Sequence, residues 1–474
     1  MAELPYLLQQ GTFNDKTDDY IVVNPDTEEI SSPWARKNIA RKITWSSRKI
    51  LKLNSTNSDG KSIVTFGPDA HFARNITMIV NWPALEVNRV YADRVRVCYP
   101  NNLGFRPIIK FRLMLDGKER GVVERYSADA IHQFYRNPTT SEASYDCSLG
   151  RLPFLTEWSN SIPKWTTDID VAFDLGSPDN PIELWATNDA HIEASIEVNI
   201  MEIIRMETLK DGEWVPIPPR PQYLINHGAL REPLYPQFYC ELGKVKKEEL
   251  QNYMEESESR PIRRYFDHFV IKDDNTKAFG QVANLKIGIK QKCTAIMSFV
   301  TNVEYEAQHN TSNYTTNECL KLGWSPISRH ALTHGDAVVH FDLPHEYLSR
   351  SIPRQNNLTS PVDDGFGIYL LGTRPTEPPP DLGYNFGRMD SSYRISIEDG
   401  SSFLKNLHIS DHENLDDEIQ SGKILEFSFE NSKSQQKFIA CLVLRLIKYY
   451  RLHRGEDGKF THVDLLIEDS LNLP

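Results

Sequence analysis

The stretch that decides the fold is residues 95–136, VRVCYPNNLGFRPIIKFRLMLDGKERGVVERYSADAIHQFYR. Apolar residues alternate with other residues at Val95, Val97 and Tyr99, and apolar residues recur over residues 108–115. A period of two is typical of a β-strand that buries one face. The Pro-Asn-Asn-Leu-Gly break at residues 100–104 separates the two runs. We therefore predict two strands in this stretch.

A tight reversal and a short helix follow these strands. Asp116 and Gly117 tolerate the positive φ that a two-residue hairpin turn requires. Ser127 is placed to cap a helix over residues 128–135, which puts Ile131 and Phe134 on one side. A strand, a hairpin and a covering helix do not indicate catalysis.

Length and composition favour two β-rich domains. The 474 residues exceed what one core usually supports, so we expect two domains of about 200 residues. The chain has 28 Pro and 24 Gly, scattered as in a protein of many short strands. The net charge of −12 argues against nucleic-acid binding as the main activity, since that activity needs a basic surface.

The chain lacks the usual signals of secretion, metal binding and disulfides. The N-terminus MAELPYLLQQ has neither a basic start nor a long apolar run, so it is not a signal peptide. The sequons at Asn54, Asn75, Asn310, Asn313 and Asn357 are therefore attributed to chance. The cysteines form no C-x-x-C pair and are expected to be reduced thiols; they are Cys98, Cys147, Cys240, Cys293, Cys319 and Cys441.

The pattern divides the chain into four parts. Residues 1–40 have no sustained period and are expected to form an N-terminal arm, and residues 41–205 are expected to form a first β-sandwich. Residues 206–261 are expected to connect it to a second sandwich over residues 262–474. Within the connector, residues 214–221 are too rich in proline to join a sheet, and residues 244–258 form an amphipathic helix. Residues 137–164 are expected to be a long loop.

Four segments resemble the double jelly-roll major capsid proteins of large eukaryotic DNA viruses. Three of them are residues 95–136, the strand, turn and strand of residues 62–83, and the two strands of residues 182–204. The fourth, DLGYNFGRMD, resembles the family pattern through Pro380, Gly383, Asn385, Phe386, Arg388 and Asp390.

The resemblance implies an all-β fold of two consecutive eight-stranded jelly-roll sandwiches, with short helices in connecting loops. It also implies a structural capsid protein with no enzymatic activity, cofactor, metal or direct nucleic-acid contact. Such a protein self-assembles as a homotrimeric, pseudo-hexameric capsomer that tiles an icosahedral shell in the virion. The expected partners are neighbouring capsomers, minor capsid or penton proteins, and an internal membrane layer that the N-terminal arm contacts. Assembly is expected inside the host cell, in the cytoplasm or nucleus. The chain is short for the family, which leaves open a major, minor or scaffolding role.

Two groups of residues offer other chemistry. His330 and His334 are four apart, with His340 and His345 following, but the glutamate of a metalloprotease motif is missing and Gly335 ends any helix. We therefore expect loop or subunit-contact histidines. Asp168 and Asp170 share one face of a predicted strand over residues 168–175, near the separation used in glycoside hydrolysis. Asp174 continues the row, so an exposed polar face accounts for all three.

A carbohydrate-binding or carbohydrate-active β-sandwich is the alternative function. Glycan sites need exposed aromatic residues beside acidic ones, and the candidates are Trp158, Trp165, Trp185 and Trp324. The chain contains no G-x-S-x-G, P-loop or G-x-G-x-x-G motif, which argues against the common hydrolases, NTPases and dinucleotide-binding enzymes.

Overall fold

The computed structural model describes most of the chain between residues 43 and 465. The described residues are 22–23, 30–31, 43–53, 61–67, 70–135, 141–177, 180–225, 230, 232–259, 263–289, 291–318, 323–334, 338–359, 361, 365–371, 384–385, 391–398, 436–454 and 460–465. Most of the predicted arm and Cys319 lie outside these ranges, as do residues 423–430, whose sequence also predicts a strand of the second sandwich. Of the DLGYNFGRMD segment, only Tyr384 and Asn385 are described.

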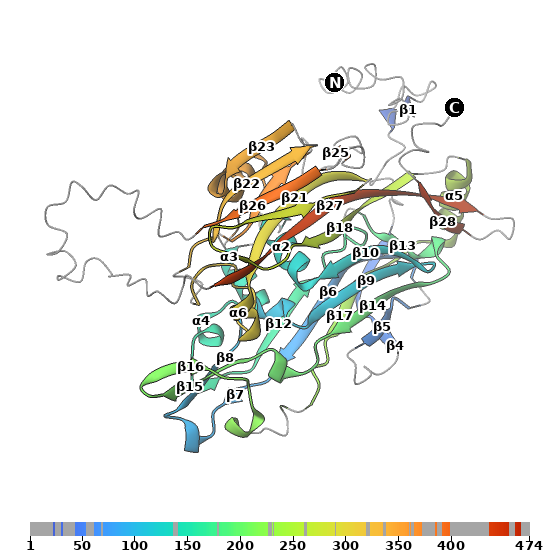
Figure 1. Cartoon of the computed structure of the whole chain (residues 1–474). Coiled ribbons are helices and arrows are strands. Elements are labelled where there is room, and N and C mark those ends of the chain that lie inside the picture. Colours follow the sequence, from blue (N-terminus) through green and yellow to red (C-terminus); the bar gives the residue numbers. More distant parts are fainter. Residues whose placement is uncertain are drawn as a thin grey trace.

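The first sandwich consists of two antiparallel sheets (Figure 1). One sheet has the order β12-β6-β17-β3, with β13 also paired to β6, and the other has the order β10-β9-β14-β5-β4. The strands are β3 (Thr44–Lys49), β4 (Leu51–Leu53), β5 (Lys61–Thr65), β6 (Phe72–Trp82), β9 (Ile108–Leu115), β10 (Lys118–Glu124), β12 (Trp165–Asp170), β13 (Ile182–Glu183), β14 (Ala190–Ile196) and β17 (Gln237–Lys244).

The second sandwich has the same construction. One sheet has the order β18-β27-β21-β24, with β19, β25 and β28 attached to it, and the other has the order β20-β26-β22-β23. The strands are β18 (Arg263–Asp273), β19 (Lys277–Ala278), β20 (Val282–Lys286), β21 (Lys292–Asn302), β22 (Ile327–His334), β23 (Val338–Pro344), β24 (Gly367–Leu370), β25 (Tyr384–Asn385), β26 (Ser391–Ile397), β27 (Lys437–Arg454) and β28 (Phe460–Leu465).

Both sandwiches have jelly-roll topology. We number the eight main strands of each sandwich from 1 to 8 in chain order. They are β3, β5, β6, β9, β10, β12, β14 and β17 in the first sandwich, and β18, β20, β21, β22, β23, β24, β26 and β27 in the second. In both sandwiches one sheet then has the order 1-8-3-6 and the other has the order 2-7-4-5. This is the strand order of two interlocked Greek keys, which defines the jelly roll. The expected all-β fold of two successive jelly rolls is confirmed.

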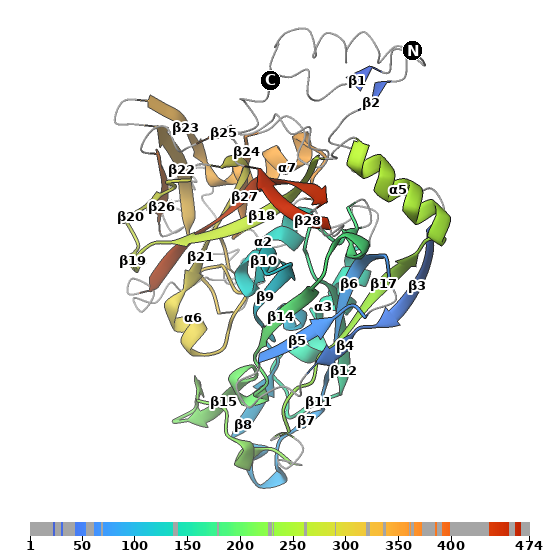
Figure 2. The same cartoon turned by 90° about the vertical axis from the view of Figure 1, so that its right-hand side faces the viewer.

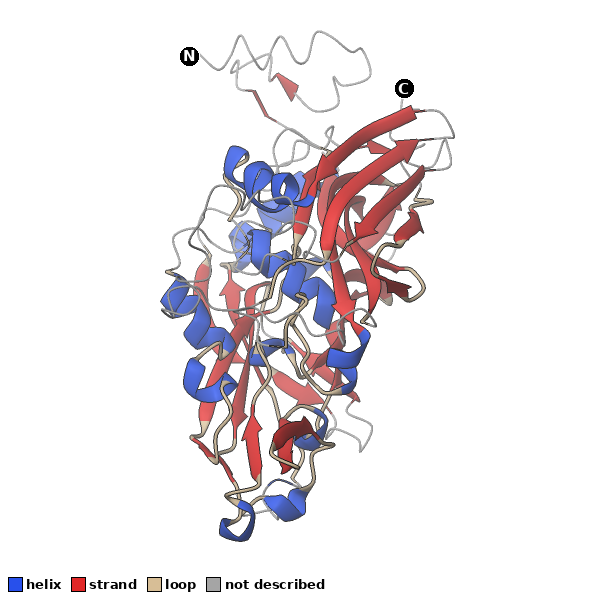
Figure 3. Cartoon of the chain, turned by 60° about the vertical axis from the view of Figure 1, so that its left-hand side comes forward, coloured by secondary structure: helices blue, strands red, loops and turns tan. Residues whose placement is uncertain are grey.

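Short helices lie in the connections between strands (Figure 3). They are α2 (Arg125–Tyr135), α3 (Glu142–Leu149), α4 (Pro153–Thr156), α5 (Lys247–Ser259), α6 (Val303–Ala307), α7 (Ile352–Gln355) and the π-helical turn η9 (Tyr347–Ser351). The hairpin at Asp116 and Gly117 forms as predicted, with φ of 50° and 74°. The helix predicted at residue 128 begins at Arg125, because Ser127 bonds back to the main chain of Glu124 within the first turn.

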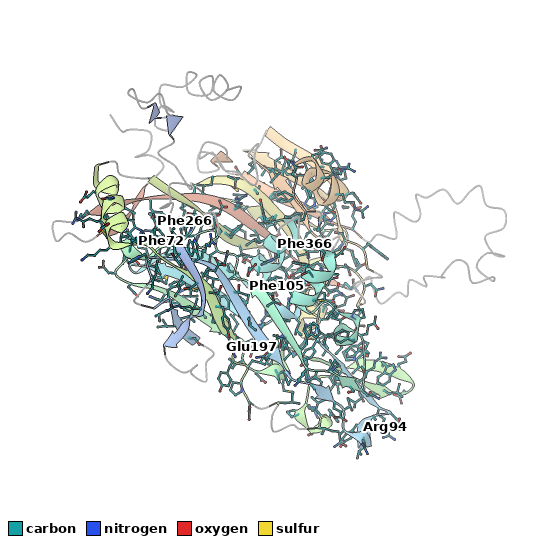
Figure 4. All side chains as sticks on the ribbon, turned by 180° about the vertical axis from the view of Figure 1, so that it is seen from behind. Phe72, Arg94, Phe105, Glu197, Phe266 and Phe366 are labelled. Atoms are coloured by element: carbon teal, nitrogen blue, oxygen red, sulfur yellow. The ribbon has the colours of Figure 1, made fainter. Side chains whose placement is uncertain are left out.

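One end of the first sandwich carries an additional small sheet (Figure 2). Strands β16 (Glu213–Pro216), β15 (Arg205–Lys210) and β8 (Val95–Cys98) form it, and β7 (Leu85–Glu86) pairs with β11 (Ser161–Ile162) beside it. Figure 4 shows Arg94, which precedes β8, at this extremity of the molecule. We call the three-stranded sheet of β16, β15 and β8 the end sheet.

Three local expectations are wrong. The proline-rich stretch does enter a sheet, because β16 is an edge strand whose outer side needs no backbone donor. Residues 137–164 contain α3 and α4, and the Ser141 cap and Gly150 with a φ of 72° mark the two ends of α3. Strand β12 ends at Asp170, so Asp174 does not continue its row of carboxylates.

Strand β17 lies within residues 206–261, the range expected to connect the two sandwiches. It pairs with β6 and β3, and it is therefore the eighth strand of the first jelly roll. A long excursion through β15 and β16 separates it from β14, the seventh strand. Helix α5 follows β17 and leads to the second sandwich, close to the predicted range of residues 244–258.

Candidate functional site

The junction between the two sandwiches combines an apolar cluster with buried polar groups, and it is the candidate functional site. Helix α2 belongs to the first sandwich, yet its buried side chains Ala130, Ile131 and Phe134 share an apolar cluster with the second. The partners come from β21, β24, β27 and the loops beside them: Ala295, Met297, Phe299, Tyr314, Leu358, Phe366, Ile368, Cys441 and Val443. The helix thus covers the outer face of a sheet in the neighbouring sandwich.

This arrangement buries both faces of strands β21 and β27. On β27, Leu442 and Leu444 point into the core of the second sandwich, whereas Cys441 and Val443 contact the cluster around α2. The same alternation holds on β21, where Ile296 faces inward and Met297 faces α2. A strand that is buried on both sides has a continuous apolar sequence, as residues 438–444 do.

A buried polar network around Asp129 joins the two sandwiches. Asp129 of α2 has no exposed surface, and its carboxylate accepts hydrogen bonds from Asn102 Nδ2 at 2.9 Å, from Ser312 Oγ and from Tyr314 Oη. Arg106 lies 3.5 Å from the same carboxylate and also donates to Ser312. Because Ser312 and Tyr314 belong to the second sandwich, these bonds determine how the two halves dock.

Tyr314 is suited to donate a hydrogen bond within this network. Burial, together with the nearby carboxylate of Asp129, raises the pKa of Tyr314 well above its ordinary value. The phenol therefore keeps its proton and satisfies a buried anion. The segment that carries Tyr314 is itself well ordered by hydrogen bonds: Asn313 Nδ2 donates to the carbonyl of Asn317 at 2.7 Å, and Asn310 Nδ2 donates to that of Glu318 at 3.0 Å.

A second buried pair lies at the C-terminal end of α2. Arg445 of β27 is paired with Asp267 of β18, and its guanidinium also lies 4.7 Å from the ring centroid of Tyr135 on α2. Asp174 of the first sandwich accepts the backbone N–H of Asp267 at 3.1 Å. Removal of either partner from such a buried ion pair lowers the stability of the fold, because the remaining charge is left buried and unpaired.

Cations and aromatic rings connect the end sheet to the second sandwich. Arg96 lies over Trp214 at 4.2 Å and over Trp158 at 5.3 Å, and it pairs with Glu207 at 2.7 Å. Arg205 lies over the same Trp158 at 4.7 Å and pairs with Glu318 of the second sandwich at 2.8 Å. Trp158, a candidate for glycan binding, is therefore part of this internal stack.

The other candidate tryptophans also make internal contacts in different places. Trp165 packs edge-on against Phe154 with ring centroids 5.5 Å apart, and Trp185 packs against Phe460 at 5.1 Å. Trp324 is half-buried and its carbonyl accepts from Thr316 N at 3.0 Å. These contacts do not gather the predicted residues into one glycan-binding face.

The candidate carboxylates Asp168 and Asp170 are exposed on β12. They border a pocket of about 430 Å³ with an apolar floor that includes Ile131 and Ile169. Asp170 accepts a hydrogen bond from Thr77 at 2.9 Å. Both carboxylates are solvated at the surface, whereas a catalytic carboxylic acid is typically held in an apolar environment. The structure therefore favours an exposed polar face.

The four histidines are not arranged as a metal site on a helix. His330 lies on β22 and His340 on β23, and His345 follows β23. His330 and His345 form a buried pair. Among the described residues, no group of three or more His, Cys, Asp or Glu side chains is placed to hold a metal ion. No described helix has the length and apolar character needed to cross a bilayer.

Two of the sequons lie inside the junction. Asn310 and Asn313 are 1% and 3% exposed, so neither side chain is accessible for glycosylation in the folded chain. The same polar run, NTSNYTTN, contains Ser312 and Tyr314, which donate to Asp129.

Asp129 was not predicted from the sequence. Its partners lie 27, 183 and 185 positions away, and no local pattern connects them.

Comparison with known proteins yields similarity in structure but not in sequence. No protein-family model matches the chain, and no curated protein matches it. The Faustovirus major capsid protein superposes with a TM-score of 0.62 at 8% identity, covering 87% of this chain and 91% of that one. The PBCV-1 virus capsid superposes with a TM-score of 0.60 at 9% identity, covering 90% and 98% of the two chains.

A third comparison, with PBCV-1 VP54 fitted into a reconstruction of the virophage Sputnik, has the same TM-score of 0.60 at 9% identity. The similarity spans both sandwiches, since it covers 90% of this chain. Together with the repeated strand order 1-8-3-6 and 2-7-4-5, it shows that this chain has the double jelly-roll fold of these viral capsid proteins.

Proposed function

We propose that the chain is a structural protein of a viral capsid and that three copies assemble into one pseudo-hexameric capsomer. The main support is the presence of two sandwiches of identical topology in one chain, docked through a buried junction. Three such chains around a threefold axis present six similar blocks, and such a unit has a nearly hexagonal outline. Closed symmetry of this kind limits growth to a defined particle.

The mass of the purified protein tests this proposal. We expect light scattering coupled to size exclusion to give three times the chain mass of 54.5 kDa, and negative-stain images of that peak to show a hexagonal outline. A single chain mass over the whole accessible concentration range would contradict the trimer.

The remaining assignments rest on the resemblance to this protein class. The capsomer tiles an icosahedral shell in the virion and is made inside the host cell. Neighbouring capsomers and minor capsid or penton proteins are its partners, and the N-terminal arm contacts an internal membrane layer. The chain acts without enzymatic chemistry, cofactor or direct nucleic-acid contact. Imaging of purified virus particles, with the chain located by antibody labelling, tests its place in the shell.

A further inference from the structure

The second sandwich contains a buried pair of histidines in direct contact. His330 on β22 is 0% exposed and His345, which directly follows β23, is 3% exposed. Their ring atoms His330 Nε2 and His345 Nδ1 lie 2.8 Å apart, which is hydrogen-bonding distance. The proposed assembly does not use this pair of buried imidazoles. We therefore ask what a hydrogen bond between two titratable rings does in the folded chain.

The geometry is satisfied when both imidazoles are neutral. The hydroxyl of Tyr393 lies 3.2 Å from Nδ1 of His330 and can donate to it. His330 then carries its proton on Nε2 and donates to Nδ1 of His345. A proton on Nδ1 of His345 as well would place two donors against each other, so the contact depends on at least one neutral ring.

The described groups that contact His330 are uncharged hydroxyls and the neighbouring imidazole. Ser298 of β21 lies 3.5 Å from His330 Nδ1, and Tyr393 comes from β26. Burial, followed by the neighbouring His345, lowers the pKa of His330 well below its ordinary value. Among the side chains that the structure describes on β22, β23, β26, η9 and α7, the charged groups are exposed: Arg329, Asp342, Glu346, Arg350, Arg354 and Arg394. Arg329 and Asp342 pair with each other at 3.0 Å.

The pair is connected to the junction through a short segment, residues 345–359. Leu348 of this segment is fully buried beside Gly367, where an added Cβ would lie 3.3 Å from both Leu348 Cβ and His330 Nε2. At the other end, Thr359 donates to the carbonyls of Phe134 and Gln133 on α2 at 3.2 and 2.9 Å. The segment thus extends from the histidine pair to the first sandwich.

We propose that the His330–His345 pair is an acid-sensitive latch that holds residues 345–359 against helix α2 while both rings are neutral. Protonation in the opened state stabilises the released segment, because an exposed imidazole accepts a proton that the buried ring of His330 resists. Acid therefore loosens the junction from the side of the second sandwich, before the two sandwiches themselves unfold.

Hydrogen exchange of the full wild-type chain tests the latch without any substitution. Between about pH 7.5 and about pH 5.5, opening should become about tenfold more favourable for each histidine that takes up a proton, after correction for the chemical exchange rate. The extra exchange should be confined to residues 345–359 and the facing turn of α2. Unchanged protection there, or an equal loss throughout the second sandwich, would overturn the proposal.

Matched substitutions identify the groups that respond. His345→Asn keeps an acceptor near the position of Nδ1, and His330→Gln keeps a donor near the position of Nε2. Each variant should lose most of the acid-induced exchange in residues 345–359. His268→Asn removes another buried histidine, on β18, and should leave that response unchanged. A response that persists in both latch variants, or disappears in the control, would contradict the assignment. If a variant fails to fold at neutral pH, the wild-type comparison still decides.

Discussion

At the scale of residues, the junction depends on buried polar groups that are complete only when both sandwiches are present. Asp129 and Arg106 come from the first sandwich, and Ser312 and Tyr314 come from the second. An apolar contact tolerates small displacements, but hydrogen bonds to a buried carboxylate require defined positions. The network therefore gives the docking its specificity more than its strength.

Asp129→Ala should be strongly destabilising. The substitution leaves Arg106, which is 1% exposed, without its carboxylate, and we expect a loss of about 3–5 kcal/mol in the free energy of unfolding. Urea titration followed by circular dichroism measures it. Asp189→Ala is the matched control, since the side chain is 60% exposed and its loss should change stability by less than about 0.5 kcal/mol. Equal effects of the two changes would argue against the network.

His268 should make stability depend on pH. Burial, followed by Lys448 and Lys110, lowers its pKa from 6.5 to about 4. The unfolded chain then binds more protons than the folded chain between these two values, so this contribution is complete above about pH 6.5 and is lost as the pH falls towards 4. The full difference is about 3 kcal/mol.

His268→Leu removes this titration. The free energy of unfolding of the variant should fall less steeply than that of the wild type between about pH 6.5 and about pH 4, in urea titrations at matched ionic strength. Parallel curves for the two proteins would show that His268 is protonated in the folded chain as readily as in the unfolded one.

At the scale of elements, helix α2 is shared between two domains. It is connected to β10 of the first sandwich, yet Phe134 and Ala130 pack on the second. Ile131 and Phe134 lie on one side of this helix, as the sequence predicts, and both are buried. The periodicity of a single helix could not reveal which sheet that side covers, because periodicity reports burial and not the identity of the partner.

Phe134→Ala should weaken the junction by creating a cavity. Phe134 is fully buried, and we expect a loss of about 3–5 kcal/mol in urea denaturation. Phe154→Ala removes the same atoms from a ring that is 46% exposed, so a much smaller loss of about 1 kcal/mol is expected. If both substitutions cost the same, α2 does not fill a close-packed space.

At the scale of the whole molecule, the two sandwiches share cores as well as polar contacts. Phe266, Tyr450 and Phe460 of the second sandwich belong to the main apolar cluster of the first. Arg120 of β10 lies 5.2 Å from the ring centroid of Tyr450, between the two halves. Domains joined over a large apolar contact do not move independently.

The two sandwiches should consequently unfold together. Tryptophan fluorescence reports mainly on the first sandwich, which holds Trp82, Trp165 and Trp185, whereas circular dichroism reports on all strands. Urea transitions followed by the two probes should coincide in the wild-type protein. In Phe134→Ala the weakened coupling should separate them, and separate transitions already in the wild type would contradict the shared core.

The sequence by itself determined the class of fold: alternating apolar residues, Asp116 and Gly117 at a hairpin, and scattered proline and glycine specify many short strands through local geometry. Ile169, Val171, Phe173 and Leu175 alternate with Asp168, Asp170 and Asp174 in the sequence, as one buried face requires, and all four are buried in the first sandwich. Only the tertiary structure decided which strands pair, that β17 completes the first jelly roll, and that Asp129 meets Ser312 and Tyr314. The pairing of β17 with β3 joins residues 190 to 200 positions apart, and Asp129 lies 183 and 185 positions from Ser312 and Tyr314. The energies of these contacts come from burial that exists only after the chain has folded.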